Sequence, residues 1–511
     1  MGLLQENGPC FVGPDSNSTI LNPWSWNNEV NMLYLDQPTQ VGFSYDVPTN
    51  VTVNFAASEV DQVIKPFKFT DGNIPADNYT FFTGTMGSQS ALSTANSTTH
   101  AAHALWHFAQ TWFSEFPAYK PNDEKISLWT KSYGGHYGPS FFKFFQEQNE
   151  KITNGTIKEE GTHYLHLDTL GVVNGLLDII EQLPAYAQMA YNNTYGLELI
   201  NKTTYENGMD DWFKPGGCKE KMLKCQEQAA ELDPDWNGNV DSVNQCFEDL
   251  KGRCISIVDA AEATTNWGWF VSRIPMQTLL LSHSWVLEAL GVPVNFSSSS
   301  SAVFAAFGTT HDIERRGSIE AVSYLLDSGV KVHMVYGDRD YACNWLGGEA
   351  ASLTIKYSRS DQFKQAGYAP ILGSDRIGGF VRQFGNFSFS RVLQAGHEVP
   401  WYQPEVSYNI FMRAIFNKDI ATGTLPVFDD LATIGPSSTF HFKNTVPEAP
   451  DPRCYILNPD SCTPEQYAGV KDGTAIVRDF FAVDSTRHAA NSDPPEEDGQ
   501  HLFVGFGQDE L

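Results

Sequence analysis

A serine placed between a short apolar run and a glycine-rich segment constrains this chain more than any other feature. The run from Leu128 to Pro139 places apolar residues first, then Ser132 and two glycines, then residues compatible with a helix. This order predicts a strand, a sharp turn with the serine at its apex, and a helix. Such a turn exposes the serine oxygen to a base and directs the following amide, that of Tyr133, at the oxyanion of an acyl transfer. A serine after a strand is more often an ordinary turn residue, so the motif alone does not identify a nucleophile.

Two later segments supply the partners that a nucleophilic serine needs. Val332–Asp340 is an apolar strand that ends in a glycine and two acids, and Ser390–Pro400 is a strand followed by a glycine and His397. The order serine, acid, histidine is that of the α/β-hydrolases. We therefore predict that His397 takes the proton of Ser132 and that a buried acid orients its imidazole.

Four segments together resemble the serine carboxypeptidase family, over roughly residues 1 to 480. The resemblance is carried by the nucleophile, acid and histidine blocks and by an upstream strand and loop, and the opening segment is similar to that of fungal extracellular members. The four segments are Ser132–Tyr137, Gly337–Gly347, Gly396–Pro400 and Asn31–Tyr45, and the opening segment is Glu6–Cys10.

The resemblance implies an α/β-hydrolase fold and an enzyme that releases residues from the C-termini of peptides and proteins. Asp340 matches the family's catalytic acid and Asp338 a flanking one, so the implied triad is Ser132, Asp340 and His397, with Tyr133 as oxyanion donor. No metal or organic cofactor is implied, and His136 is expected to be structural. An acyltransferase of the same fold and a catalytically inactive binding homologue are the alternatives.

The resemblance also implies three substrate-binding residues. Glu6 matches a glutamate in the network that holds the substrate carboxylate, and Lys131 stands where the family usually has glutamate. Its ammonium could pair with Glu6 or bind the carboxylate directly, extending activity toward neutral pH. Glu398 matches a position that lines the pocket before the cleaved bond and would favour Lys or Arg there; a solvated surface acid is the alternative.

The start of the chain departs from the family. Its members carry an Asn-Gly-Gly-Pro-Gly loop before the opening segment, which supplies a second oxyanion donor and a carboxylate-binding asparagine. Met1 begins within the helix that should follow this loop. We therefore expect a truncated sequence that lacks the loop, the N-terminal strands and a secretion signal, with impaired activity.

Charge and hydropathy exclude several classes of partner. The 511 residues include 33 basic and 61 acidic ones, giving a formal net charge of −28 at pH 7. This balance argues against nucleic acid or an anionic membrane as partner. Apolar runs fall well short of the roughly 18 residues that a membrane span requires. The oligomeric state is not indicated.

The alternation of strand and helix divides the chain into expected parts. Residues 182–312 interrupt the alternation and are predicted to form a mostly helical lid, which includes an aromatic cluster at Trp267, Trp269 and Phe270. The acidic end is expected to be disordered. The parts are 1–181 (first half of the core), 182–312 (lid), 313–420 (second half of the core), 421–484 (C-terminal extension) and 485–511 (tail).

Apolar spacing predicts individual elements within the core. Buried strands are expected at Met32–Leu35, at Lys125–Thr130 and at Leu170–Val173, and helices at 318–328 and 404–416. Residues 99–116 are expected to form an amphipathic helix with one apolar side made by Leu105, Phe108, Trp112, Phe113 and Phe116.

Eight cysteines indicate an oxidising compartment. Two pairs within 182–312 are spaced at about two helical turns, so each pair can share a helix face, and a hairpin of two such helices would form nested bridges. Zinc is the rival reading, but no Cys-x-x-Cys spacing occurs. The expected bridges are Cys218–Cys254, Cys225–Cys246 and Cys454–Cys462, which leaves Cys10 and Cys343, the latter similar to a free thiol near the site in some family members.

Glycosylation sequons and the cysteines favour a secreted or vacuolar protein. The last residues, Gln508–Leu511, are similar to an endoplasmic-reticulum retention signal, and an acidic tail ending by chance is the alternative. The sequon asparagines are Asn17, Asn50, Asn78, Asn96, Asn154, Asn192, Asn201, Asn295 and Asn386.

Overall fold

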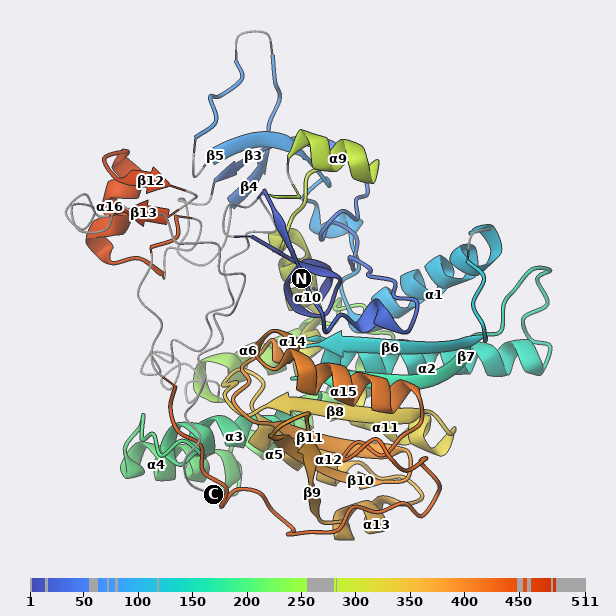
Figure 1. Ribbon diagram of the computed structural model, residues 1–511. Coiled ribbons are helices and arrows are strands. Elements are labelled where there is room, and N and C mark those ends of the chain that lie inside the picture. Colours follow the sequence, from blue (N-terminus) through green and yellow to red (C-terminus); the bar gives the residue numbers. More distant parts are fainter. Residues whose placement is uncertain are drawn as a thin grey trace.

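A six-stranded mixed sheet forms the centre of the molecule (Figure 1). The computed structural model describes residues 2–13, 17–54, 63–70, 73–78, 81–116, 119–254, 280–281, 283–447, 454–456, 461–478 and 481–483. The first four strands of the sheet run parallel, and the last two are antiparallel to their neighbours. In spatial order the strands are β6 (Lys125–Lys131), β7 (His166–Val173), β8 (Lys331–Gly337), β11 (Phe387–Val392), β10 (Ile377–Phe384) and β9 (Tyr368–Leu372).

The register of the parallel strands brings their carboxyl ends to one edge of the sheet. Lys131 at the end of β6 pairs with Val173 at the end of β7, which pairs with Val335 of β8. Gly337 at the end of β8 pairs with Val392 at the end of β11. The residues that follow these four strands are therefore neighbours in space, although they are far apart in the sequence.

Helices cover both faces of this sheet because successive strand residues point to opposite sides. On one face, Met334 joins a core with α2 (Gly134–Thr153), α11 (Ser318–Asp327) and α12 (Trp345–Thr354). On the other, Val335 packs with apolar residues of α15 (Pro404–Ile415). This is the α/β-hydrolase arrangement that the sequence predicts. The predicted strands at 125–130 and 170–173 and the predicted helices at 318–328 and 404–416 are all present. Their ends agree with the prediction within one residue, except that β7 begins four residues earlier than predicted.

The connection between β7 and β8 is helical, and two disulfides join α5 to α6. Cys218–Cys254 and Cys225–Cys246 are nested, as predicted, so zinc ligation by these cysteines is excluded. Before α11, the described elements of this connection are α3 (Ile179–Tyr191), α4 (Lys202–Phe213), α5 (Cys218–Leu232), α6 (Asp241–Cys254), α9 (Ser284–Leu290), α10 (Ser301–Thr310) and the short 3-10 helix η4 (Asp312–Glu314).

The N-terminal part forms small sheets outside the central one. A π-helical turn, η1 (Gly2–Glu6), precedes a hairpin of β1 (Cys10–Val12) and β2 (Thr19–Leu21). A further antiparallel sheet has the order β4 (Val63–Pro66), β3 (Thr49–Asn54), β5 (Phe81–Met86).

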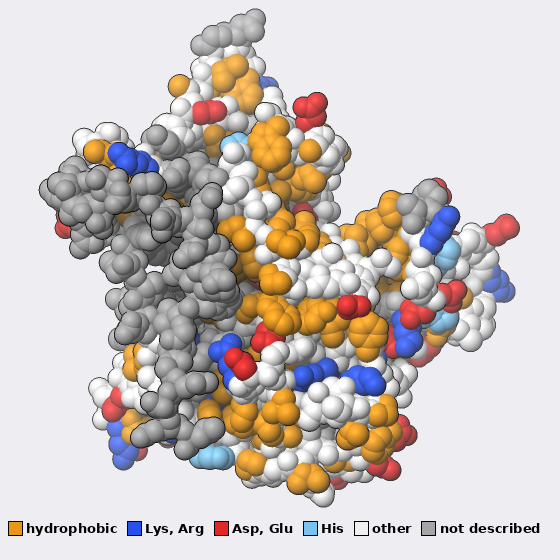
Figure 2. All heavy atoms as spheres, viewed as in Figure 1, with side chains coloured by type: hydrophobic (Ala, Val, Ile, Leu, Met, Phe, Trp, Pro, Cys, Tyr) orange, Lys and Arg blue, Asp and Glu red, His pale blue; other side chains and the backbone are white. Residues whose placement is uncertain are grey.

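The predicted buried strand at Met32–Leu35 is wrong. This segment is irregular, and Leu33 and Leu35 are 46% and 41% exposed. Four apolar residues indicate burial only when a neighbouring strand accepts their backbone hydrogen bonds, and no described strand pairs with this segment. Exposed apolar side chains are not confined to this segment, because Figure 2 shows such side chains over the middle of the face that it draws.

Helix α1 (Thr98–Glu115) forms as predicted, but its aromatic side chains do not share one environment. Phe113 packs against the core, as does Leu105. Phe108 and Phe116 are exposed and stack on Trp112 between them. Residues four apart are neighbours on a helix surface, so these three rings cover one another rather than the core.

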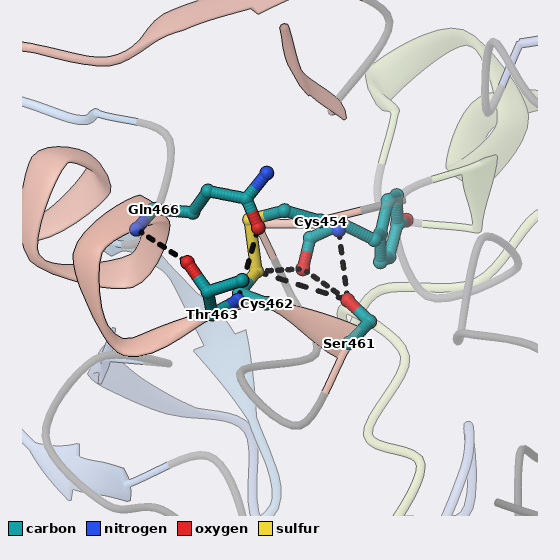
Figure 3. The surroundings of a disulfide bond; sticks show 6 residues. Cys454, Ser461, Cys462, Thr463 and Gln466 are labelled. Atoms are coloured by element: carbon teal, nitrogen blue, oxygen red, sulfur yellow. Dashed lines mark hydrogen bonds between the residues drawn. A yellow bond between two sulfur atoms is a disulfide. The ribbon is translucent and has the colours of Figure 1, made fainter. Parts of the chain in front are cut away.

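The C-terminal part contains the third predicted disulfide, Cys454–Cys462 (Figure 3). The hydroxyl of Ser461 accepts a hydrogen bond from the amide of Tyr455, and Thr463 with Gln466 forms a capping box at the start of α16 (Pro464–Asp472). A hairpin of β12 (Ile476–Arg478) and β13 (Phe481–Val483) follows. Three disulfides are typical of a protein folded on a secretory route.

Some predictions concern residues outside the described part of the chain. These are the aromatic cluster at Trp267, Trp269 and Phe270 and the tail 485–511 with Gln508–Leu511. Among the helices of the described residues, none is both long and apolar enough to cross a bilayer.

Candidate active site

Ser132 lies at the apex of a strained turn between β6 and α2. Its φ of 62° is in the left-handed region, which costs energy for a residue with a side chain. Its amide donates to the carbonyls of Val173 and Asn174 at 3.1 Å, and its carbonyl accepts from the amide of Leu176 at 2.9 Å. A Cβ on Gly135 would lie 2.4 Å from the Leu176 carbonyl oxygen, so this close approach of helix and loop requires glycine.

Tyr133 is the N-cap residue of α2. The first amides of a helix have no acceptor within it, and the positive end of the helix dipole lies at the same place. The amide of Tyr133 is therefore in an environment that suits a negatively charged oxygen.

His397 and Asp340 form a directly bonded pair at the carboxyl edge of the sheet. His397 Nδ1 lies 2.6 Å from Asp340 Oδ2, and Asp340 is buried. Burial lowers the pKa of His397, but the charge of Asp340 and the hydrogen bond to it outweigh this effect and leave the pKa raised. Asp340 follows β8 and His397 follows β11, so the paired strands bring them together.

Asn174 also contacts Asp340, which the sequence did not reveal. Its side-chain nitrogen donates to Asp340 Oδ2 at 2.6 Å, while its side-chain oxygen accepts from the amide of Gly337. Because its own carbonyl accepts from the amide of Ser132, Asn174 links the acid to the nucleophile turn.

Cys343 is the free thiol expected beside the site. One potential ligand atom each from Cys343, Asp340 and His397 lies within 4.8 Å of the others. Burial raises the pKa of Cys343 well above its usual value, and a hydrogen bond with Ser132 opposes this only in part. The thiol therefore stays protonated, and His397 Nδ1 already bonds Asp340, so the group is poorly suited to binding a metal ion.

Asp338 is the centre of a closed group that we call the Asp338 cluster, made of Asp338, Arg391, Tyr195 and Asn444. Arg391 Nη2 donates to Asp338 Oδ2 at 3.0 Å, and both side chains are fully buried. Tyr195 and Asn444 donate to the same carboxylate at 2.6 Å and 2.5 Å. Burial raises the pKa of Asp338, opposed by Arg391 and by the hydrogen bonds from Tyr195 and the Gln394 amide. The cluster joins the helical connection, the sheet edge and the C-terminal segment.

A second group, the Lys131 cluster, consists of Lys131, Glu6, Glu398 and Gln5. Lys131 Nζ lies 2.6 Å from Glu6 Oε1 and 3.6 Å from Glu398 Oε1, and Gln5 donates to Glu398 Oε1 at 3.2 Å. Glu398 is 3% exposed, so the alternative of a solvated surface acid is wrong. Its Oε2 is buried and has no hydrogen-bond partner in the described part of the chain.

The charges of the Lys131 cluster do not balance when both glutamates are ionised. Burial raises the pKa of Glu398, and Glu6 adds to this while Lys131 opposes it. Burial lowers the pKa of Lys131, but its two carboxylate neighbours outweigh burial and raise it overall. Lys131 therefore remains charged, and Glu398 takes up a proton more readily than an ordinary glutamate, because its pKa is raised.

Both ring nitrogens of His136 face backbone carbonyls. Its Nδ1 is 2.5 Å from the Leu176 carbonyl and its Nε2 is 3.3 Å from that of Ile313. It is buried, which fits the expected structural role.

Most sequon asparagines lie on the surface. Asn96, Asn295 and Asn386 are half-buried, and the Asn386 side-chain nitrogen donates to two backbone carbonyls, which leaves it poorly placed for a glycan. The exposed ones are Asn17, Asn50, Asn78, Asn154, Asn192 and Asn201.

The fold and this site define a serine hydrolase of the α/β-hydrolase class, and comparison with known proteins gives its family. Residues 1–417 match the family described as serine carboxypeptidase, and the chain belongs to this family. Carboxypeptidase S1 homolog A of Arthroderma otae is 49% identical over 510 residues, which cover 97% of this chain and 77% of the relative. A carboxypeptidase Y homolog of Arthroderma benhamiae is 39% identical, covering 99% of this chain and 82% of the relative.

A solved structure supports the fold independently. Kex1(delta)p, a prohormone-processing carboxypeptidase from Saccharomyces cerevisiae, superposes with a TM-score of 0.54 over 81% of this chain and 79% of that one. At 19% identity this likeness establishes the α/β-hydrolase fold alone.

Proposed function

We propose that this chain releases C-terminal residues from peptides through an acyl-enzyme formed on Ser132. His397 Nε2 takes the proton of the Ser132 hydroxyl as its oxygen attacks the last peptide carbonyl, and the Tyr133 amide donates to the resulting oxyanion. The proton then passes to the leaving amine, and water repeats the sequence to free the acyl group. The observation that carries this proposal is the Asp340–His397 bond at the sheet edge that also bears the Ser132 turn.

The Lys131 cluster supports a role in binding the free carboxylate of the substrate. Lys131 directly precedes the nucleophile and keeps its charge, and an ammonium attracts a carboxylate without needing a shared proton. Oε2 of Glu398, which has no hydrogen-bond partner among the described residues, can donate to the same carboxylate when Glu398 is protonated. Glu6 then balances the charge of Lys131.

The preference of Glu398 for a basic residue before the cleaved bond stays a prediction. A substrate cation there would compete with Lys131 for the same carboxylate, since Lys131 lies 3.6 Å away. Comparing a basic with an aliphatic substrate, before and after Glu398→Gln, measures the preference. An unchanged ratio of kcat/KM would rule it out.

Turnover of an N-blocked dipeptide with a free C-terminus tests the main proposal. We expect release of the last amino acid by the natural chain and loss of release in Ser132→Ala, by a factor of about 10⁶. An added alcohol or amine acceptor that captures most of the acyl group would indicate an acyltransferase instead. Absence of Ser132-dependent turnover with substrate still bound would indicate an inactive binding homologue.

A secreted or vacuolar location follows as part of the same proposal. It is supported by the three disulfides and by six exposed sequon asparagines. A fall in apparent mass after treatment of the natural protein with an N-glycosidase would support it, and an unchanged mass would argue against passage through the glycosylating compartments.

A further inference from the structure

Asp312 is a buried acid that the catalytic scheme does not use. It lies in η4, where the helical connection returns to the sheet, and its side chain is fully enclosed. Oδ1 accepts from the backbone amide of Thr98 at 2.8 Å, and Oδ2 accepts from the hydroxyls of Thr98 at 2.6 Å and Tyr133 at 2.5 Å. One carboxylate therefore joins η4, the start of α1 and the residue after the nucleophile.

The donors to the Asp312 carboxylate are two hydroxyls and one backbone amide, all of them neutral. No ion pair between described residues includes Asp312. Thr98 is the first residue of α1, so the carboxylate lies at the positive end of an 18-residue helix. Hydrogen bonds from neutral donors to a charged acceptor are shorter and stronger than those between neutral groups.

The ring of Tyr133 is held on its other sides by aromatic neighbours. It stacks on His136 at 5.1 Å between centroids and meets Tyr137 and Phe307 edge-on at 5.0 Å and 5.9 Å. Burial, and then the charge of Asp312, raise the pKa of the Tyr133 phenol far above its usual value, so the phenol remains a hydrogen-bond donor to Asp312. The side chain thus has one orientation, fixed at its far end.

We propose that Asp312 is a positioning residue which, through the phenol of Tyr133, fixes the direction of the Tyr133 amide toward the oxyanion. The backbone of Tyr133 is the first point at which α2 leaves the strained Ser132 turn, and its side chain is tied across the turn to η4 and α1. An enzyme with a displaced Tyr133 amide would bind the substrate as before but would stabilise the transition state less, because only the transition state carries the negatively charged oxygen. This inference rests on the proposed function of Ser132 and Tyr133.

Two variants and one control test this role. Tyr133→Phe removes the hydroxyl that donates to Asp312, and Asp312→Asn keeps the shape of the side chain but removes its charge. The control, Tyr137→Phe, removes a neighbouring hydroxyl that is not among the hydrogen-bond donors to Asp312. For each, kcat and KM are measured with a blocked dipeptide, and inhibition is measured with a peptide aldehyde, whose adduct on Ser132 carries an oxyanion. Thermal unfolding shows whether each variant is folded, and active-site titration gives the concentration of active enzyme.

We expect kcat to fall about 10- to 100-fold in Tyr133→Phe and in Asp312→Asn, with KM within about twofold. Aldehyde affinity should fall by the same factor as kcat, and the double variant should lose little more than either single one, because both act on one bond. Tyr137→Phe should be unchanged. If Asp312→Asn does not fold, the kcat and the aldehyde affinity of Tyr133→Phe alone test the inference.

Unchanged kcat and aldehyde affinity in Tyr133→Phe would overturn the inference, and so would a loss confined to KM. If the natural chain shows no Ser132-dependent turnover, the proposed function fails as well. Ser132-dependent turnover with an unaffected Tyr133→Phe variant would leave the proposed function intact and refute only the role of Asp312.

Discussion

The Asp338 cluster and the Lys131 cluster each include a close sequence neighbour of the Asp340–His397 pair, and they balance their charges in opposite ways. In the Asp338 cluster one acid meets one base, both fully buried, and the carboxylate also accepts from Tyr195, Asn444 and the amide of Gln394. In the Lys131 cluster one base meets two acids, and the lysine side chain is 18% exposed. Oε2 of Glu398 has no hydrogen-bond partner in the part of the chain that the structure describes.

This difference separates a structural role from a binding role. Removing one member of a closed, buried ion pair leaves the other charge without compensation, so the Asp338 cluster should act mainly on stability. A cluster with unequal charges and a partly exposed lysine can be completed by a ligand or by a proton. The Lys131 cluster should therefore act mainly on substrate affinity and pH dependence.

Asp340→Asn should have the largest effect, and on activity alone. An amide in place of the acid favours the wrong tautomer of His397, so kcat should fall about 10⁴-fold with little change in unfolding free energy. Asp338→Asn is the matched control two residues away, and it should lower stability while the folded fraction keeps most of its activity. Similar profiles for the two variants would show that the two acids are not functionally distinct.

Arg391→Met should lower the free energy of unfolding by about 3–5 kcal/mol, because it leaves Asp338 buried without its cation. Arg316→Met is the control, since Arg316 pairs with Glu320 on the surface and its loss should cost no more than about 1 kcal/mol. Urea titrations of both variants measure the difference. Equal losses would contradict the view that the Asp338 cluster is a closed structural unit.

Lys131→Glu should shift the pH range of peptide turnover toward acid. The natural cluster attracts a carboxylate through its ammonium, whereas the variant would hold three carboxyl groups and would need protons to bind one more. We expect the KM of the variant at neutral pH to rise about 10-fold or more, from the loss of a charged hydrogen bond. Superimposable profiles of kcat/KM from about pH 4 to 8 would place Lys131 outside the substrate site.

Glu398→Gln should have the smallest effect, on the pH dependence of stability. Because the pKa of Glu398 is higher in the folded than in the unfolded chain, its contribution is fully present below its ordinary pKa and is lost as pH rises through the raised value. The variant should therefore lose less stability than the natural protein as the pH rises above about 4. Glu320→Gln, on the surface, should leave the dependence unchanged, and equal slopes for Glu398→Gln would refute this assignment.

The sequence predicted the parts of the site that depend on local order. Ser132, Asp340 and His397 each follow a strand, and parallel strands place their ends together whatever the length of the connections. The nested disulfides could be predicted because helical spacing alone puts each cysteine pair on one face.

The supporting contacts could not be predicted because they join distant segments with no motif of their own. Asn174 bonds an acid 166 residues away, and Asp312 bonds a tyrosine 179 residues away. The prediction of a buried strand at Met32–Leu35 was wrong for a related reason. Burial of a strand depends on a neighbouring strand, and four apolar residues do not show whether one is present.

The nested disulfides have a consequence for how the oxidised protein assembles. Cys218 and Cys225 lie two turns apart on α5, which separates their Cα atoms by about 10.5 Å, beyond the roughly 7 Å that a disulfide can bridge. Once α5 and α6 have formed, a cysteine cannot pair with its neighbour on the same helix, and closing the inner bridge leaves only short flanks for the outer one. Helix formation thus restricts oxidation to bridges between α5 and α6, and this restriction depends only on the local geometry of the two helices.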